Sequence, residues 1–244
     1  MAGDRYEPAG PISGAVHGFE QTFIALLLGL MTLVTFASVV VRYVFNSAVG
    51  RWFEGLLGID LPDTILWGQE VVLILFAWLV LFGIGFCVKI TAHLGVDAVI
   101  NLFARPGRGV FALLAALASV AYALLLLKGA WDYWAPFAAF DRTSGRWFPT
   151  GFEQTRDQAW YITDQVPMLG VFGWLEGAIN QGEEYEKLPR VIPYVILPIG
   201  VLLLVIRYVQ ATIGIYRGDR ESLIASHEAE DAVEEAAQTA KGEG

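Results

Sequence analysis

The stretch QTFIALLLGLMTLVTFASVVV, residues 21–41, decides the fold class, because it contains no charged side chain. Three more charge-free runs follow, at residues 71–88, 109–127 and 191–206. Roughly 17 to 25 apolar residues in a helix cross a hydrocarbon core of about 30 Å, so the first three runs are long enough as they stand. The fourth reaches that length with Leu188 before it and with Tyr208 and Val209 after it. The sequence therefore predicts an all-α integral membrane protein with four transmembrane helices.

The composition agrees with a membrane protein. Hydrophobic residues make up 55% of the 244 residues, charged residues make up 17%, and the mean hydropathy is +0.52. An ordinary soluble domain carries about 25% charged residues. A transmembrane β-barrel is excluded because these runs are continuously apolar, whereas barrel strands alternate apolar and polar residues.

We expect a membrane domain over residues 1–220, with spans at about 18–45, 65–88, 108–131 and 189–213. Pro193 and Pro198 lie in the fourth span, where a membrane helix tolerates them with a kink. Residues 49–63 are expected to form a loop of mixed character. Residues 221–244 form an acidic tail with seven carboxylates and only Lys241 as a base, which is typical of a disordered segment. A partner-binding helix is the alternative for this tail.

Residues 89–105 show the pattern of an amphipathic helix that lies in the membrane interface. Polar residues recur every four positions, at Lys89, His93, Asp97 and Asn101. We expect this row to face lipid headgroups or water, and we expect Pro106 and Gly107 to end the helix before the third span. His93 and Asp97 would supply only two metal ligands, whereas a closed structural site needs about four, so no metal is expected.

The segment of residues 132–187 is far longer than a usual connection between helices. It is rich in aromatic residues, which include Trp134, Phe137, Phe140, Trp147 and Tyr161. These rings are buried either at the membrane interface and within the loop, or against another protein. The uncharged residues 165–175 are too few to span a bilayer and fit an interfacial helix.

The second span carries Trp67, Glu70, Ile74 and Trp78 near one helical face, which favours packing over chemistry. Arg42 ends the first span and Glu70 begins the second, so both reach the same membrane face if the two helices are antiparallel. They either pair with each other or point separately into the headgroups.

The sequence offers no reaction centre. Cys87 is the only cysteine, which excludes an internal disulfide and a multi-cysteine metal or iron–sulfur site. All three histidines lie outside the apolar runs, which disfavours a haem site, and no run contains the ionisable residue that a proton- or ion-coupled carrier places at mid-membrane. No catalytic or nucleic-acid-binding motif is present. We expect no enzyme, cofactor, metal or nucleic-acid partner; an autonomous small carrier or channel lined by Thr32, Thr35 and Ser38 is the alternative to an accessory subunit.

Five short motifs occur in order around the spans. They are HGFE at residues 17–20, RYVFN at 42–46, WGQE at 67–70, HLGVDAVIN at 93–101 and PIG at 198–200, the last followed by Arg207. In these motifs the chain resembles the small membrane subunit (Q, DctQ-like) of tripartite ATP-independent periplasmic (TRAP) transporters. The motif at 93–101 is most similar to the branch that serves C4-dicarboxylates. Residues 49–63 and 132–187 depart from the family pattern because both segments are longer than usual.

The resemblance implies a division of labour in sodium-coupled uptake of an organic acid. A periplasmic substrate-binding protein captures the acid, a large membrane subunit transports it, and the small subunit braces the large one. The partners implied are these two proteins and membrane lipids. The candidate structural or interface residues are Arg42, Trp67, Glu70, Trp78, Lys89, His93, Asp97, Asn101 and Arg207.

The implied location is the bacterial inner membrane. The density of Lys89, Arg105, Arg108, Arg217 and Arg220 near span ends favours cytoplasmic termini, with the long aromatic loop in the periplasm.

Overall fold

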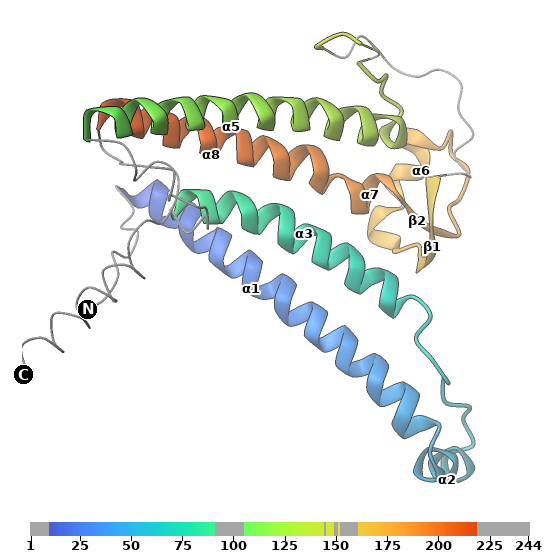
Figure 1. Ribbon diagram of the computed structural model, residues 1–244. Helices are drawn as coiled ribbons and strands as arrows, with labels where there is room; N and C mark the ends of the chain where they lie inside the picture. Colours follow the sequence, from blue (N-terminus) through green and yellow to red (C-terminus); the bar gives the residue numbers. More distant parts are fainter. Residues whose placement is uncertain (1–9, 91–104, 144, 149–150, 152–160, 219–244) are drawn as a thin grey trace, which may run out of the picture. The chain divides into compact units, whose positions relative to one another are not determined.

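Four long helices dominate the computed structural model, which describes residues 10–90, 105–143, 145–148, 151 and 161–218 (Figure 1). They are α1 (Pro11–Val40), α3 (Gly68–Lys89), α5 (Arg105–Trp134) and α8 (Ile196–Arg217). A π-helical turn, Val41–Phe45, extends α1, and a 3-10 turn, Ala135–Ala138, extends α5. The segments long and apolar enough to cross a membrane are Ser13–Phe45, Gly68–Lys89, Gly109–Ala138 and Val191–Arg217. The prediction of four spans is confirmed.

The helices extend beyond the apolar runs. Helix α1 begins at Pro11, seven residues before the expected start, because backbone hydrogen bonding continues where hydrophobicity falls. Helix α5 begins at Arg105, three residues before the expected start of the third span, and includes Pro106 and Gly107 in its first turn. The last turn of the expected interfacial helix, before Arg105, lies outside the described residues. Proline fits the first turn because its missing N–H would have no intrahelical partner.

The fourth span is divided into α7 (Val191–Tyr194) and α8, with Val195 between them. Pro198 has no N–H to donate to the carbonyl of Tyr194, four residues earlier, so the helical hydrogen bonds are interrupted at this point. The interruption agrees with the kink expected from the prolines of this span.

Residues 49–63 contain a helix that the sequence reading took for a loop. Helix α2 (Ala48–Leu57) is capped by Ser47, whose Oγ accepts from the N–H groups of Val49 (3.2 Å) and Gly50 (3.4 Å). It ends at Gly58, which adopts the left-handed conformation (φ 65°) common after a helix. The prediction of a mixed loop was therefore wrong for residues 49–57.

The chain forms two compact units, and each takes a part of every span. The first comprises residues 1–17, 83–127 and 201–244. Here Val88 of α3 packs with Leu204 and Ala211 of α8. Ala112 and Ala116 of α5 pack with Ile215 of α8, and their small side chains allow the two helices to approach closely.

The second unit comprises residues 18–82 and 128–200 and contains the only sheet in the described residues. Strands β1 (Ile162–Pro167) and β2 (Lys187–Pro189) pair antiparallel, with Ile162 opposite Pro189 and Pro167 opposite Lys187. Between them lie a 3-10 turn, Gly170–Phe172, and helix α6 (Trp174–Ile179). The interfacial helix expected over residues 165–175 is therefore wrong, because Pro167, Gly170 and Gly173 break that segment into a strand end and turns.

Candidate functional site

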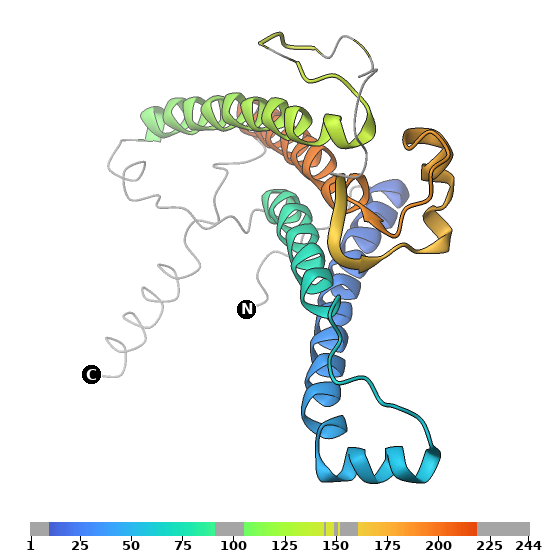
Figure 2. The ribbon, with the colours of Figure 1, turned by 90° about the vertical axis from the view of Figure 1, so that its right-hand side faces the viewer.

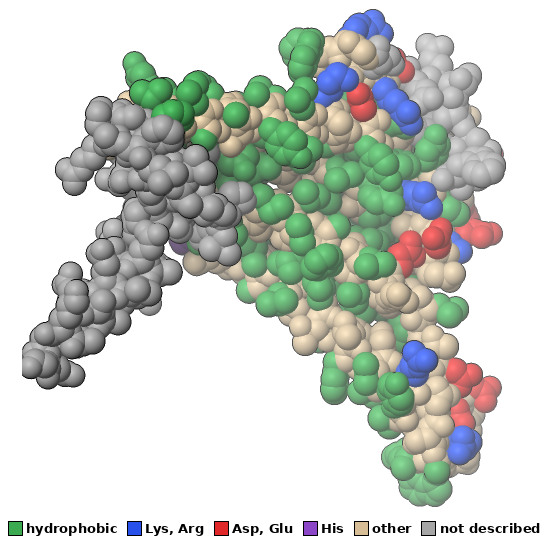
Figure 3. Space-filling view, in the orientation of Figure 1, with side chains coloured by type: hydrophobic (Ala, Val, Ile, Leu, Met, Phe, Trp, Pro, Cys, Tyr) green, Lys and Arg blue, Asp and Glu red, His purple; other side chains and the backbone are tan. Residues whose placement is uncertain are grey.

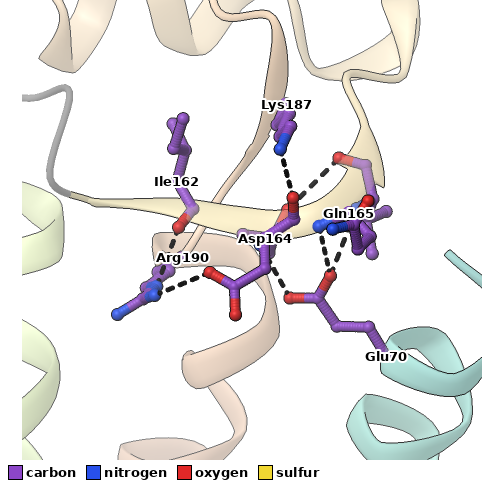
Figure 4. Close-up of polar contacts among 8 residues, drawn as sticks. Glu70, Ile162, Asp164, Gln165, Lys187 and Arg190 are labelled. Atoms are coloured by element: carbon purple, nitrogen blue, oxygen red, sulfur yellow. Dashed lines mark hydrogen bonds and ion pairs between the residues drawn. The ribbon is translucent and has the colours of Figure 1, made fainter. Parts of the chain in front are cut away.

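The carboxylate of Glu70 connects the start of α3 to strand β1 (Figure 4). Its Oε1 accepts from the backbone N–H of Asp164 at 3.0 Å. Its Oε2 accepts from the N–H groups of Gln165 at 2.7 Å and Val166 at 3.2 Å. Three successive N–H groups thus converge on one carboxylate, an arrangement that suits a negative charge. We call this the Glu70 contact.

The irregular pairing of β1 explains why these N–H groups are available. The register between β1 and β2 shifts between its two ends, Ile162 and Pro167, so the middle of β1 does not follow a regular ladder. Glu70 also lies in the first turn of α3, where the helix dipole favours a negative side chain. Strand irregularity and helix position therefore both favour this carboxylate contact.

Two basic residues, one in β2 and one just after it, also bind this strand. Lys187 donates from Nζ to the carbonyl oxygen of Asp164. Arg190 donates from Nε to the carbonyl oxygen of Ile162 at 2.8 Å, and its Nη2 lies 3.4 Å from Oδ1 of Asp164. That ion pair is largely exposed and contributes little by itself, so the backbone contacts are the stronger part of the arrangement.

An aromatic core supports the loop. Phe137, Leu175 and Val191 are buried together. The ring of Phe137 lies 5.1 Å from that of Tyr161 and 5.2 Å from that of Tyr194, measured between centroids. Trp134 donates from Nε1 to the carbonyl oxygen of Val191 at 3.0 Å. Phe137 is thus buried, and Trp134 and Tyr161 are partly buried, by packing within the unit, which is one of the two alternatives for the loop aromatics.

Other aromatic side chains of the loop remain on the surface. Trp147, Phe148 and Trp174 are each at least 66% exposed. These three side chains are available for contact with lipid or with another protein.

The end of α5 is tied to the following segment by a polar cluster. Lys128 donates from Nζ to Oδ2 of Asp132 (2.9 Å) and to Oγ1 of Thr143 (2.6 Å). The backbone N–H and the hydroxyl of Thr143 in turn lie 2.6 and 2.7 Å from Oδ1 of Asp132. Thr143 is buried, so this cluster satisfies its polar groups and fixes the chain where it leaves the span.

Trp78 joins the second and fourth spans. Its Nε1 donates to the carbonyl oxygen of Pro193 at 2.8 Å, and its ring lies 6.4 Å from that of Phe23 on α1. The expected packing role of this face holds for Trp78, whereas Trp67, just before α3, is 39% exposed.

Glu70 does not pair with Arg42. Glu70 directs both oxygens to β1, and the described part of the chain contains no ion pair between these two residues. Arg42 is an exposed residue of the π-helical turn, and its carbonyl oxygen accepts from Nδ2 of Asn46 at 3.0 Å. The hypothesis of a pair is therefore wrong for this structure.

The row that begins at Lys89 is only partly described. Lys89 is the last residue of α3 and is only 5% exposed. The prediction that its side chain faces lipid headgroups or water was therefore wrong. His93, Asp97 and Asn101 lie outside the described residues, as does most of the expected interfacial helix. Arg207, in the fourth span, is half-buried and donates from Nη1 to Oε1 of Gln210 at 3.0 Å.

Sequence reasoning missed the partners of Glu70. No pattern in the sequence indicates the backbone of residues 164–166, and Glu70 lies 94 positions before Asp164. The only local signal was the acidic residue in the first turn of a helix, and it does not name a partner. The groups of the Glu70 contact are held in hydrogen bonds, so this arrangement serves to position the loop.

Comparisons with known proteins agree with this architecture. The family model described as "Tripartite ATP-independent periplasmic transporters, DctQ component" matches residues 31–150. A relative from Vibrio cholerae, named C4-dicarboxylate TRAP transporter small permease protein DctQ, is 40% identical over 215 residues, covering 88% of this chain and 78% of the relative.

Two further relatives carry the same name. The one from Pseudomonas aeruginosa is 29% identical, over 88% of this chain and 90% of its own length. The one from Rhodobacter capsulatus is 30% identical, over 39% of this chain and 48% of its own length. The chain belongs to the DctQ family, the non-enzymatic small membrane component of bacterial TRAP transporters.

Proposed function

We propose that this chain braces the large membrane subunit of a TRAP transporter that takes up C4-dicarboxylates. The observation that carries the substrate class is the name of the relatives, above all the Vibrio cholerae protein at 40% identity. The sodium coupling and the periplasmic binding protein follow from the family, and the large subunit would hold the sites for substrate and sodium.

The character of the spans supports a bracing role. The four apolar runs carry no charged residue, so no ionic pathway is evident along them. Large apolar side chains face outward from them, among them Leu33, Phe36 and Leu73, each more than 60% exposed. Helices of this kind suit contact with lipid or with the apolar helices of another subunit.

Co-purification tests the proposal. We expect the tagged chain, expressed together with the other TRAP components and extracted in mild detergent, to retain a large multi-span membrane protein. Sodium-driven uptake of a C4-dicarboxylate into vesicles should require this chain, the large protein and the binding protein together. Uptake by vesicles that contain this chain alone would contradict the brace and favour an autonomous carrier.

We also propose a topology in the inner membrane. Residues 1–220 form the membrane domain, residues 221–244 form a cytoplasmic tail, both termini are cytoplasmic, and the loop with the Glu70 contact is periplasmic. The basic residues near the span ends support this orientation.

Cysteine labelling in intact cells checks the topology. In a Cys87→Ser background, the exposed position Glu184 is changed to Cys and treated with a membrane-impermeant maleimide. We expect labelling of Glu184→Cys in intact cells, and labelling of Ser226→Cys only after lysis. The reverse pattern would invert the orientation.

A further inference from the structure

Helix α2 carries an apolar face that no described residue covers. Its members follow helical spacing and are between 43% and 64% exposed: Val49, Trp52, Phe53, Leu56 and Leu57. The rings of Trp52 and Phe53 pack edge to face, with centroids 5.0 Å apart. In Figure 3 the hydrophobic side chains of this helix form the tip drawn lowest, with charged side chains beside them.

The two charged residues of α2 lie on the other side of the helix, and both form hydrogen bonds with backbone groups of the segments that flank α2. Arg51 donates from Nη1 to the carbonyl oxygen of Asn46 at 3.3 Å. Glu54 accepts at Oε1 from the N–H of Leu61 at 3.1 Å. The helix is thus sharply amphipathic, with a polar side that faces its own loop and an apolar side left outward.

Close packing fixes α2 against the end of the first span. Gly50 is buried against the π-helical turn, and a Cβ at this position would lie 1.8 Å from the carbonyl oxygen of Phe45. Only glycine permits this approach. Figure 2 shows α2 running across the end of α1 instead of continuing its axis.

A side-chain amide joins the two ends of the segment between the first and second spans. Asn46 donates from Nδ2 to the carbonyl oxygens of Arg42 (3.0 Å) and Asp63 (2.8 Å). The segment that leaves the first span is therefore tied to the residues just before α3, where the second span starts. Helix α2 begins three residues after the first span ends at Phe45, so it must remain at the depth of a span end.

We propose that the apolar face of α2 lies in the boundary between lipid headgroups and acyl chains. Tyr43 and Val44, in the π-helical turn that ends the first span, are also exposed, so the outward apolar surface extends from the span to within a few residues of α2. Tryptophan and phenylalanine suit this depth. The helix has one Arg and one Glu, so its binding depends on apolar contact and needs no anionic lipid.

Fluorescence quenching in vesicles of phosphatidylcholine tests this placement. In a Cys87→Ser background, Leu56→Cys places an environment-sensitive probe on the apolar face. Gly55→Cys is the matched control, since a Cβ there meets nothing within 4 Å. Leu30→Cys, an exposed position within the first span, serves as the deep reference.

We expect a lipid with a spin label near the headgroup to quench the probe at position 56 roughly threefold more than the probe at position 55. Aqueous iodide should show the opposite preference, and a spin label deep in the acyl chain should quench position 30 most strongly. Val49→Cys should behave as Leu56→Cys does, which guards against a local effect of one substitution.

Two results would overturn the proposal. Equal quenching of positions 55 and 56 by iodide would place the face in water. Lipid quenching of position 56 that disappears when the large subunit is reconstituted with the chain would show that protein, and not lipid, covers the face.

Discussion

Replacing Glu70 with Ala is expected to release strand β1 from α3 and to leave the three N–H groups of residues 164–166 without their acceptor. Hydrogen bonds to a charged group are worth about 1.5–3 kcal/mol each when water is excluded. Water reaches Asp164 and Gln165, so we expect a total loss of about 2 kcal/mol. This corresponds to a roughly 30-fold faster hydrogen exchange at these three amides, measured by mass spectrometry in detergent.

Two variants make the test specific. Glu70→Gln keeps one oxygen acceptor and removes the charge, so its exchange rates should fall between those of the native protein and Glu70→Ala. Gln69→Ala changes the exposed neighbouring residue on the same helical turn and should leave the amides of β1 unchanged. Unchanged exchange in Glu70→Ala would mean that Lys187, Arg190 and the aromatic core hold the loop without the carboxylate.

The membrane fold was predictable because its cause is local. A run such as residues 71–88 has no charge and the length of a bilayer, and lipid leaves helices as the available backbone solution for such runs. The helix ends were less predictable, since α1 and α5 continue into residues whose hydrophobicity no longer requires a membrane.

Helix α2 and the two strands depend on contacts that the sequence does not display. The capping residues Ser47 and Gly58 are also common in loops, and the helix is fixed by Gly50 against Phe45. Strand β2 has only three residues and ends in Pro189, so it shows no alternating pattern.

The sequence indicates some residues of the candidate site but not their partners. The sequence indicates Glu70 and Trp78 as neighbours on one helical face. Their partners, the backbone of residues 164–166 and the carbonyl of Pro193, lie 94 to 115 positions away in the sequence. Backbone groups carry no residue-specific signal, so only the folded chain identifies these partners.

Helices α3 and α8 approach each other closely at Gly200. Adding even one methyl group at this position should therefore disturb their packing. A Cβ at Gly200 would lie 2.9 Å from Cβ of Leu81 and 3.5 Å from its backbone carbonyl carbon. Since these atoms belong to the backbone and the base of a side chain, a change of rotamer cannot make room. In lipid, helices associate through such close packing and not through the hydrophobic effect, so separation of the helices removes the main attraction.

We therefore expect Gly200→Ala to destabilise the chain by about 1–3 kcal/mol, the usual cost of overpacking, and Gly200→Val to cost more. Unfolding in mixed micelles with increasing sodium dodecyl sulfate measures this as a lower midpoint. Gly29→Ala is the matched control, because it lies in α1 and a Cβ there meets nothing within 4 Å. Its midpoint should stay the same or rise, since alanine favours a helix more than glycine does. Equal midpoints for Gly200→Ala and Gly29→Ala would show that α3 and α8 can separate at this level without cost, and that the bond from Trp78 to Pro193 suffices to join them.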